Sequence, residues 1–327
     1  MSVPISVTVR DAVGNVATAT TSLLVLPIGI EQVTVPLFSG GMCRLPDGRV
    51  FVSYQRGKQP ANQLSRMIDG AGVGPDELVL PGIDPGAAIL ADGTLVAGRN
   101  KGDAYRLHPR LLAGTYDPFV EIADVGVGEV SLQNALGATW ACFSDSDISK
   151  PSNIRVGVRA IHSLADVGSP VWIPGAFTGA LDPVTMTKFQ KRPSAGGCGG
   201  QLLAAWNQPA DPVAGGIRSI WGALSPDGVS WSPTFPIAST GKDLTNPFVL
   251  DLGSETRVYY PQPGVAPLGV ASSVDGGRTW AVGSATLPPG VLAASRPNLI
   301  DVDGQVWLLA TWQDPASGGY AIALVEV

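Results

Sequence analysis

A repeated pair of short apolar strands constrains the fold of this chain more than any other feature. The repeated unit is a turn, an apolar strand, a Gly-Asp-type turn, a second apolar strand and a polar loop, and it is clearest at residues 40–55 and 85–100. Further copies start at residues 129, 192, 246 and 296, so the six starts lie 45, 44, 63, 54 and 50 residues apart. Four short strands fill such a period, which is typical of a β-propeller blade. Because helical periodicity is absent, we expect an all-β fold with a six-bladed propeller of four-stranded blades over residues 28–327.

Composition agrees with this architecture and excludes several classes of protein. The chain is 45% hydrophobic and 15% charged, with 41 Gly and 28 Pro, which is typical of short strands joined by tight turns and not of disorder. The net charge is −6 and no basic run is longer than Lys191-Arg192, so nucleic-acid binding is not expected. The longest apolar stretch, residues 23–30, is too short to span a bilayer, so membrane insertion is not expected either.

The cysteines, the histidines and the first residues bear on compartment and cofactors. Cys43, Cys142 and Cys198 lie far apart in apolar or Gly-rich runs, and we expect them to be reduced and buried. The two histidines are not spaced with these cysteines as zinc ligands would be, so no metal and no cofactor is expected. The first residues lack the basic and continuous apolar regions of a signal peptide, so we expect synthesis without one.

The strand count of the last repeat predicts how the ring closes. After Arg296 the chain contains three strands, at residues 297–300, 305–311 and 319–327. A fourth strand is needed to complete the blade, and residues 32–37 are the nearest candidate before the first repeat. Pairing this N-terminal segment with the C-terminal blade would remove the free sheet edges.

Residues 1–27 do not fit the repeat and are expected to form a separate β-hairpin arm. Residues 5–10 and 16–25 alternate between apolar and polar positions around a turn. They are similar to the last two strands of bacterial immunoglobulin-like modules, so a truncated module of that kind is one alternative for this segment. Because a lone hairpin is marginally stable, we expect the arm to dock on the propeller, pair with another chain or sit in an assembly.

A second kind of hairpin, which lies between the repeats, carries a resemblance to a known family. Residues 273–280 fit the Asp-box pattern S-x-D-x-G-x-T-W at every fixed position, and residues 225–231 are a form one residue shorter. These turns resemble the Asp boxes of sialidase-like (BNR-repeat) propellers. The resemblance implies that the box is structural, because the Asp accepts backbone N–H bonds, the Gly takes a restricted conformation and the Trp packs between sheets. The structural residues are then Asp227, Trp231, Asp275, Gly277 and Trp280.

The polar ends of the second strands are expected to converge on one face of the propeller. Amides, charged groups and aromatic rings in one ring suit sugars, whose hydroxyls need directed bonds and whose apolar faces stack. The alternative is that these residues are a solvated rim whose amides satisfy the loop backbone. The expected ligand-binding residues are Gln55, Arg56, Lys58, Arg99, Asn100, Asp145, Trp206, Asn207, Gln208, Tyr260, Gln262, Arg296, Trp312 and Gln313.

The resemblance to sialidases also implies a catalytic alternative, because these enzymes use three arginines, a Tyr–Glu couple and an acidic group. The candidates are Arg192 and Arg296 with Arg99 or Arg56 for the clamp, Tyr260 for the phenol, and Asp103 or Asp145 for the acid. The family's first-blade Arg-Ile-Pro motif is not reproduced, and Glu129 is the one glutamate expected to reach this face. No glutamate is paired with Tyr260 by sequence, so no catalytic residue is assigned on the main interpretation.

The main interpretation is therefore a non-catalytic propeller that binds a cell-surface glycan or serves as a structural part of a larger particle. A phage virion or tail-associated protein fits the missing signal peptide, and a fragment of a secreted bacterial protein fits nearly as well; the expected location is a virion or the extracellular space. The alternative is an exo-glycosidase of sialidase type, or another glycosidase that uses paired Asp residues.

Overall fold

The structure is a computed structural model of the 327-residue chain. It describes all residues except 1, 11–15, 25, 32–37, 57–61, 70–71, 76, 82, 102–103, 112–114, 117–118, 124–126, 146–153, 178–191, 212–214, 263–267, 288–290, 292–295 and 314–319.

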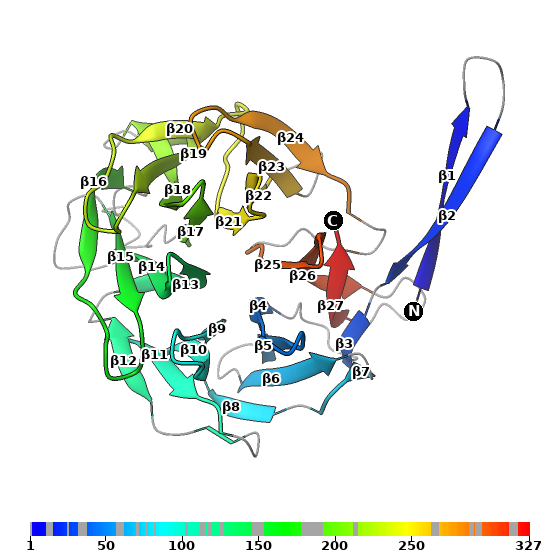
Figure 1. The fold of residues 1–327 in the computed structure, drawn as a ribbon, viewed down its shortest axis with the longest axis horizontal. Helices are drawn as coiled ribbons and strands as arrows, with labels where there is room; N and C mark the ends of the chain where they lie inside the picture. Colours follow the sequence, from blue (N-terminus) through cyan, green and yellow to red (C-terminus); the bar gives the residue numbers. More distant parts are fainter. Residues whose placement is uncertain are drawn as a thin grey trace.

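Six antiparallel sheets are arranged around a central channel, so the predicted six-bladed propeller is confirmed (Figure 1). Each blade runs from an innermost to an outermost strand, and in blade 1 both β7 and β8 pair with β6 at the outer position. The strands are, for blade 1, β4 (Phe38–Arg44), β5 (Val50–Arg56), β6 (Asn62–Asp69), β7 (Gly72–Val73) and β8 (Glu77–Pro81); for blade 2, β9 (Ile83–Ile89), β10 (Leu95–Lys101), β11 (Ala104–Pro109) and β12 (Val120–Ala123); for blade 3, β13 (Val127–Ala135), β14 (Ala138–Asp145), β15 (Arg155–Ile161) and β16 (Val171–Phe177); for blade 4, β17 (Ser194–Cys198), β18 (Gln201–Asp211), β19 (Gly215–Ser225) and β20 (Phe235–Ala238); for blade 5, β21 (Phe248–Asp251), β22 (Thr256–Pro261), β23 (Leu268–Ser273) and β24 (Ala281–Ala285); and for blade 6, β25 (Leu299–Val302), β26 (Gln305–Gln313) and β27 (Tyr320–Glu326).

The ring is closed by an N-terminal strand, but by a different segment from the predicted one. Strand β3 (Leu26–Glu31) pairs antiparallel with β27 and is the outermost strand of blade 6. The prediction that residues 32–37 form this strand is wrong, since the place is already taken; those residues lie outside the described part of the chain. Closure joins the two ends of the chain in one sheet and removes the free edges between the first and last blades.

The arm is a two-stranded sheet formed by β1 (Ser2–Arg10) and β2 (Val16–Leu24), which pair in register from Ser2↔Leu24 to Arg10↔Val16. In Figure 1 it stands beside the ring as a separate ribbon. Its predicted role in attachment or oligomerisation stays a prediction. Strand β3 begins at Leu26, which lies inside the segment assigned to the arm by sequence.

The core consists of apolar layers between neighbouring blades. Because side chains alternate along a strand, each blade sends one set of residues to the preceding blade and one to the following blade. Trp172, Trp231 and Trp280 each pack against such a layer, between blades 2 and 3, 3 and 4, and 4 and 5 respectively. Among the described residues, none belongs to a helix long and apolar enough to cross a membrane.

The two turns that resemble Asp boxes are held by carboxylate hydrogen bonds. Asp275 Oδ1 accepts the backbone N–H groups of Arg278 and Thr279, both at 3.0 Å, and its Oδ2 accepts the Thr279 hydroxyl at 2.6 Å. Asp227 Oδ1 likewise accepts the N–H groups of Val229 and Ser230, at 2.8 and 2.7 Å. These bonds stabilise the ionised carboxyl group, so the pKa of each Asp lies below its ordinary value, and the pKa of Asp227 falls to about 2.

The glycine of the blade 4 turn is required by both conformation and space. Gly228 has a φ of 74°, and a Cβ at this position would lie 2.0 Å from Cη2 of Trp140 on the neighbouring blade. No other residue combines the left-handed conformation with this close approach. The turn therefore locks blade 4 against blade 3.

The pKa of Asp227 makes the stability of the propeller dependent on acid. A carboxyl group whose pKa is lower in the folded state stabilises the fold above its unfolded pKa, and this contribution is lost as the pH falls through the folded pKa. We expect Asp227→Asn to lower stability at pH 7 and to reduce the loss of stability between about pH 4 and pH 2. Urea denaturation across this pH range measures both effects. Identical pH dependence in the variant and the parent protein would contradict the expectation.

Candidate functional site

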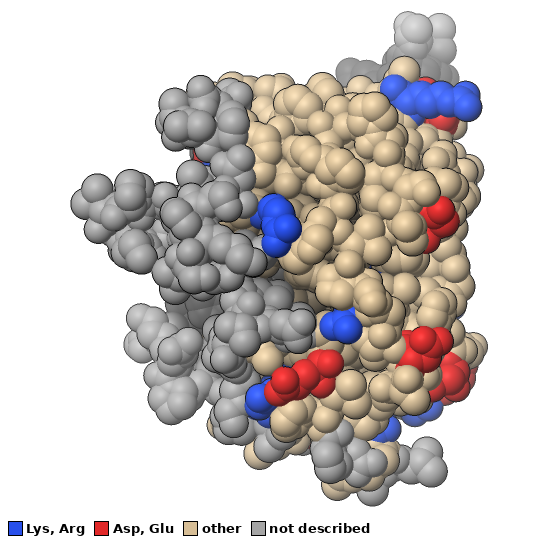
Figure 2. Space-filling view, turned by 90° about the vertical axis from the view of Figure 1, so that its left-hand side faces the viewer, with Lys and Arg blue, Asp and Glu red and all other residues tan. Residues whose placement is uncertain are grey.

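One face of the propeller collects the polar residues that the sequence singled out. The inner strands begin and the second strands end at this face, which we call the upper face; the opposite, lower face carries the turns between first and second strands. Asp47, Asp92 and Asp303 lie in those turns. In Figure 2 several acidic side chains lie on the side of the molecule away from the grey residues.

Every blade brings a buried polar side chain to the upper half of its second strand. Their exposed fractions range from 0% to 9%, whereas residues at the open end of a sheet are ordinarily solvated. The members of this ring are Gln55, Asn100, Ser144, Asn207, Gln208, Tyr260 and Thr311. All six blades contribute to this ring, whose members lie one strand outward from the innermost strands.

Four members of the ring hold polar atoms that find no hydrogen-bond partner within the described part of the chain. They are Asn100 through Oδ1, Ser144 and Tyr260 through their hydroxyls, and Asn207 through both side-chain atoms. An unsatisfied buried polar group costs about 1–3 kcal/mol, so a set of them calls for a reason other than stability. Polar ligands are one such reason.

Trp206 and Gln208 form a pair in which the tryptophan orients the amide. Trp206 Nε1 donates a hydrogen bond to Gln208 Oε1 at 2.9 Å, which fixes the amide with its NH₂ group as the remaining donor. Trp206 is fully buried in the layer between blades 3 and 4, so its ring is not a platform on which a sugar stacks. Gln208 is 7% exposed at the upper end of β18.

The arginines proposed for a carboxylate clamp belong to three different blades. Arg99 is 3% exposed and its Nε donates to His108 Nε2 at 2.8 Å, on the face of β10 that packs on blade 1. Burial lowers the pKa of Arg99, with Arg106 as a second cause. Arg192 is 6% exposed and its Nε donates to the Val130 carbonyl at 3.0 Å. Arg296 is half-buried at the entry to blade 6.

Tyr260 lacks the environment that a phenol nucleophile needs. It is fully buried in the layer between blades 4 and 5, and its ring lies over Gly269, where a Cβ would be 2.2 Å from the ring. Burial raises the pKa of Tyr260 to about 12, whereas activation requires a lowered pKa or an adjacent base. No carboxylate among the described residues accepts its proton.

Side chains of the inner strands bind neighbouring blades to one another around the channel. Ser194 Oγ accepts a hydrogen bond from Gln133 Nε2 at 2.6 Å and one from the Val249 N–H at 3.0 Å, which joins blades 3, 4 and 5. Asn246 Oδ1 accepts the Arg192 N–H at 2.9 Å, and Asn298 Oδ1 accepts the Met42 N–H at 3.3 Å. The channel wall is therefore pre-organised.

Three inner strands carry an irregularity at their upper ends that sequence reasoning missed. The pairing register slips by one residue between Phe38 and Gly41 in β4, between Ile83 and Gly86 in β9, and between Val127 and Val130 in β13. Such β-bulges redirect side chains and are common next to active sites. The bulges of the second and third blades contain the carboxylic residues Asp84 and Glu129.

Asp84, Glu129 and Asp145 are placed by the backbone at the same end of adjacent strands. Asp145 is the last residue of β14 and pairs with Val127, two positions before Glu129. Gly128 and Pro85, beside the two bulged carboxylic residues, were the only sequence signals for the bulges.

Several predicted site residues have side chains outside the described part of the structure. These are Arg56, Lys58, Asp103, Asp145, Trp312 and Gln313. Gln262 is described and half-buried just beyond β22. Within the described ranges, no group of three or more His, Cys, Asp or Glu side chains is arranged to hold a metal ion.

Comparison with known proteins identifies the fold and redirects the functional interpretation. No protein-family model and no curated protein sequence matches the chain. An α-L-arabinanase of Penicillium chrysogenum, solved with arabinobiose, has a TM-score of 0.66 at 14% identity, covering 94% of this chain and 98% of its own. The GH93 α-L-arabinofuranosidase of Fusarium graminearum, also with arabinobiose, gives 0.62 at 12% identity, covering 94% and 97%. A GH43 β-xylosidase/α-arabinofuranosidase from a compost metagenome, solved with xylotriose, gives 0.51 at 12% identity, covering 92% and 93%.

These comparisons correct the expectation of a non-catalytic propeller, because the three solved propellers reported above, which each align with more than nine-tenths of the chain, are named as glycosidases. They are arabinan- and xylose-directed by name and not sialidases, so the six-bladed propeller is established whereas membership of the sialidase family is not. They give no support to a virion or tail protein. Binding of carbohydrate by a propeller of this shape is consistent with the predicted glycan ligand.

Proposed function

We propose that this chain is a glycoside hydrolase that acts on a pentose-containing glycan at the upper mouth of the channel. The observation that carries the proposal is the alignment of the whole propeller with an arabinanase and an arabinofuranosidase, both solved with arabinobiose. The ring of buried polar side chains supports it, because directed donors and acceptors gathered at one face suit a polyhydroxylated ligand.

Glycoside hydrolysis needs two carboxyl groups, and the bulges of β9 and β13 each contain one carboxylic residue on neighbouring inner strands. One carboxylic acid donates a proton to the glycosidic oxygen as the C–O bond breaks, while the second, ionised carboxylate attacks the anomeric carbon or deprotonates the attacking water. Asp84 and Glu129 lie on adjacent innermost strands at the upper end of the channel. We assign them as the catalytic pair, with Asp145 as the nearest further carboxylic residue.

The described members of the ring are proposed to hold the sugar. Gln208 presents its NH₂ group because its oxygen is occupied by Trp206, and Asn207 carries an amide with no partner among the described residues. Amides both donate to and accept from hydroxyl groups, so they orient a furanose or pyranose ring without a charge. Tyr260 and Arg99 are not assigned to sugar binding or catalysis, because each is buried in a layer between two blades.

Hydrolysis of defined glycosides tests the proposal. We expect the full chain to release p-nitrophenol from the α-L-arabinofuranoside or the β-D-xyloside, and arabinose from linear arabinan, with the matching α-sialoside at background. Proton NMR of the first-formed sugar distinguishes retention from inversion, which reports whether a carboxylate or a water attacks. No turnover of any pentoside would overturn the proposal. Turnover of the sialoside alone would favour the sialidase alternative.

A further inference from the structure

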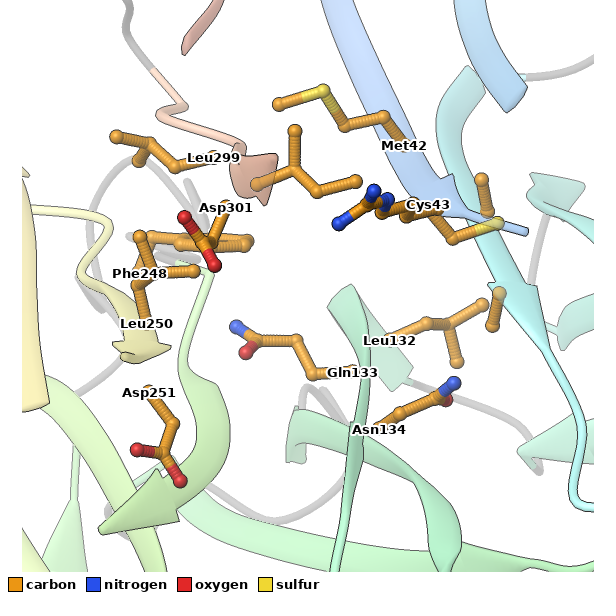
Figure 3. A pocket seen from close by; sticks show the side chains of 14 residues that line it. Met42, Cys43, Leu132, Gln133, Asn134, Phe248, Leu250, Asp251, Leu299 and Asp301 are labelled. Atoms are coloured by element: carbon orange, nitrogen blue, oxygen red, sulfur yellow. The ribbon is translucent and has the colours of Figure 1, made fainter. Parts of the chain in front are cut away.

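A cavity occupies the lower half of the central channel, away from the proposed catalytic residues. It has a volume of about 280 Å³ and is lined by residues near the lower ends of the inner strands. Figure 3 shows Gln133 and Asp301 directed into the space between these strands. The volume is close to the lower end of the range of ~300–1,000 Å³ that is usual for small-molecule sites.

The polar groups of this cavity keep hydrogen-bonding capacity after their structural bonds are counted. Asp251 Oδ1 accepts the Gly253 N–H at 2.9 Å and Asp301 Oδ1 accepts the Gly304 N–H at 3.0 Å. Within the described residues these are the bonds found for the two carboxylates, so each retains an oxygen that can accept from a ligand. Arg44 binds Asp303 through one terminal nitrogen, at 2.8 Å, and retains further N–H groups.

Inner strand β17 is built to make room for these side chains. A Cβ at Gly197 would lie 2.2 Å from Asp251 Oδ2, and a Cβ at Gly196 would lie 2.8 Å from Gln133 Oε1. Any larger residue at either position would displace a polar group of the cavity. The consecutive glycines therefore hold a carboxylate and an amide oxygen at the channel wall, in van der Waals contact with bare backbone.

The charges and the apolar lining narrow the class of ligand. The lining carries two carboxylates, Asp251 and Asp301, and one guanidinium, Arg44, which is already paired with Asp303, so an anionic ligand would be repelled. A simple ammonium ion donates hydrogen bonds but has no acceptor atom for the N–H groups of Arg44. A sugar hydroxyl both donates and accepts, and Leu132, Met42 and Leu299 offer apolar surface to the C–H face of a ring.

We propose that the lower end of the channel is a second, non-catalytic binding site for a neutral monosaccharide. Asp251 and Asp301 accept hydrogen bonds from hydroxyl groups, Arg44 donates to a ring or hydroxyl oxygen, and Gln133 accepts through Oε1. The site does not depend on the hydrolase activity proposed for the upper face, because none of its residues belongs to that machinery. It would hold a free pentose or a short glycan end while the upper mouth engages another part of the polymer.

Titration of the full chain with L-arabinose and with D-xylose, followed by ligand-observed NMR, tests the site. We expect binding with a Kd on the order of 1 mM for at least one of the two sugars. The double variant Asp251→Asn/Asp301→Asn should weaken this binding at least about tenfold, because two charge-assisted hydrogen bonds are lost. Gly197→Ala should weaken it as well by moving Asp251. Circular dichroism of each variant checks the fold.

Two controls separate the lower site from the upper one. Glu255→Gln removes a carboxylate of the neighbouring turn that is paired with Arg257 and does not line the cavity, so pentose binding should persist. Gln208→Ala alters the upper face and should also leave lower-site binding intact. Pentose binding that is lost in Gln208→Ala but kept in the double Asn variant would overturn this proposal and leave the hydrolase proposal standing. Binding of putrescine in place of either pentose, or no binding of any probe, would overturn it too.

Discussion

Replacing Glu129 by glutamine should lower kcat/KM for an aryl α-L-arabinofuranoside by about 100- to 10,000-fold, the range that a general acid or base contributes. Glutamine has nearly the same shape as glutamate but neither donates an acidic proton nor carries a negative charge. The bulge in β13 contains Glu129 at the upper end of an innermost strand, and the bulge of the inner strand β9 in the neighbouring blade contains Asp84. Steady-state kinetics with the purified full chain measures the effect.

Comparison with two further variants gives this prediction its specificity. Asp84→Asn should cause a loss of similar size, because both carboxyl groups act in one reaction. Glu121→Gln is the matched control, since Glu121 is half-exposed on the outer strand of blade 2 and pairs with Arg106 at 2.7 Å. Equal activity in Glu129→Gln and the parent protein would remove Glu129 from the mechanism. Loss of activity in Glu121→Gln would indicate an effect on folding instead.

The propeller itself was predictable from sequence because its blades repeat, whereas the closing strand was not. The segments 26–31 and 32–37 are both short and apolar, and the pairing partner β27 alone decides which of them joins blade 6. Pro27 made the first segment look like a break. In the structure Pro27 lies in β3, the outermost strand of its sheet, where a missing N–H group is tolerated.

The positions of the polar residues were predictable, but their directions were not. The second strands do end in a polar ring at one face, as the repeat spacing indicates. A propeller blade is covered by another blade on both faces. The alternation of side chains along a strand therefore predicts which residues enter the same layer between blades, but not which residues line the channel. In the structure, Trp206, Tyr260 and Arg99 lie in the layers between neighbouring blades. Glu129 was expected at this face, but Asp84 and the bulges were not, because a bulge is defined by the pairing register, which a single sequence does not contain.

Trp206→Ala should lower the free energy of unfolding by about 3–5 kcal/mol, the usual cost of removing a large aromatic side chain from a core. Trp206 is fully buried in the layer between blades 3 and 4, together with Trp140 and Cys142 of blade 3. The substitution also leaves the buried Gln208 oxygen without its donor at 2.9 Å. Urea denaturation of the full chain measures the loss.

The size of this effect distinguishes a core residue from the sugar-stacking residue that the sequence suggested. Trp206→Phe keeps most of the volume and removes the hydrogen bond to Gln208, so it should cost about 1–2 kcal/mol. Val229→Ala is the surface control, because Val229 is 65% exposed and its truncation should change stability by less than about 0.5 kcal/mol. If Trp206→Ala leaves the urea midpoint unchanged and instead weakens sugar binding, the indole faces the ligand and the burial described above is incorrect. A lowered midpoint with an unchanged KM means that the indole acts by packing two blades together, and that Gln208 is the member of the pair that faces the sugar.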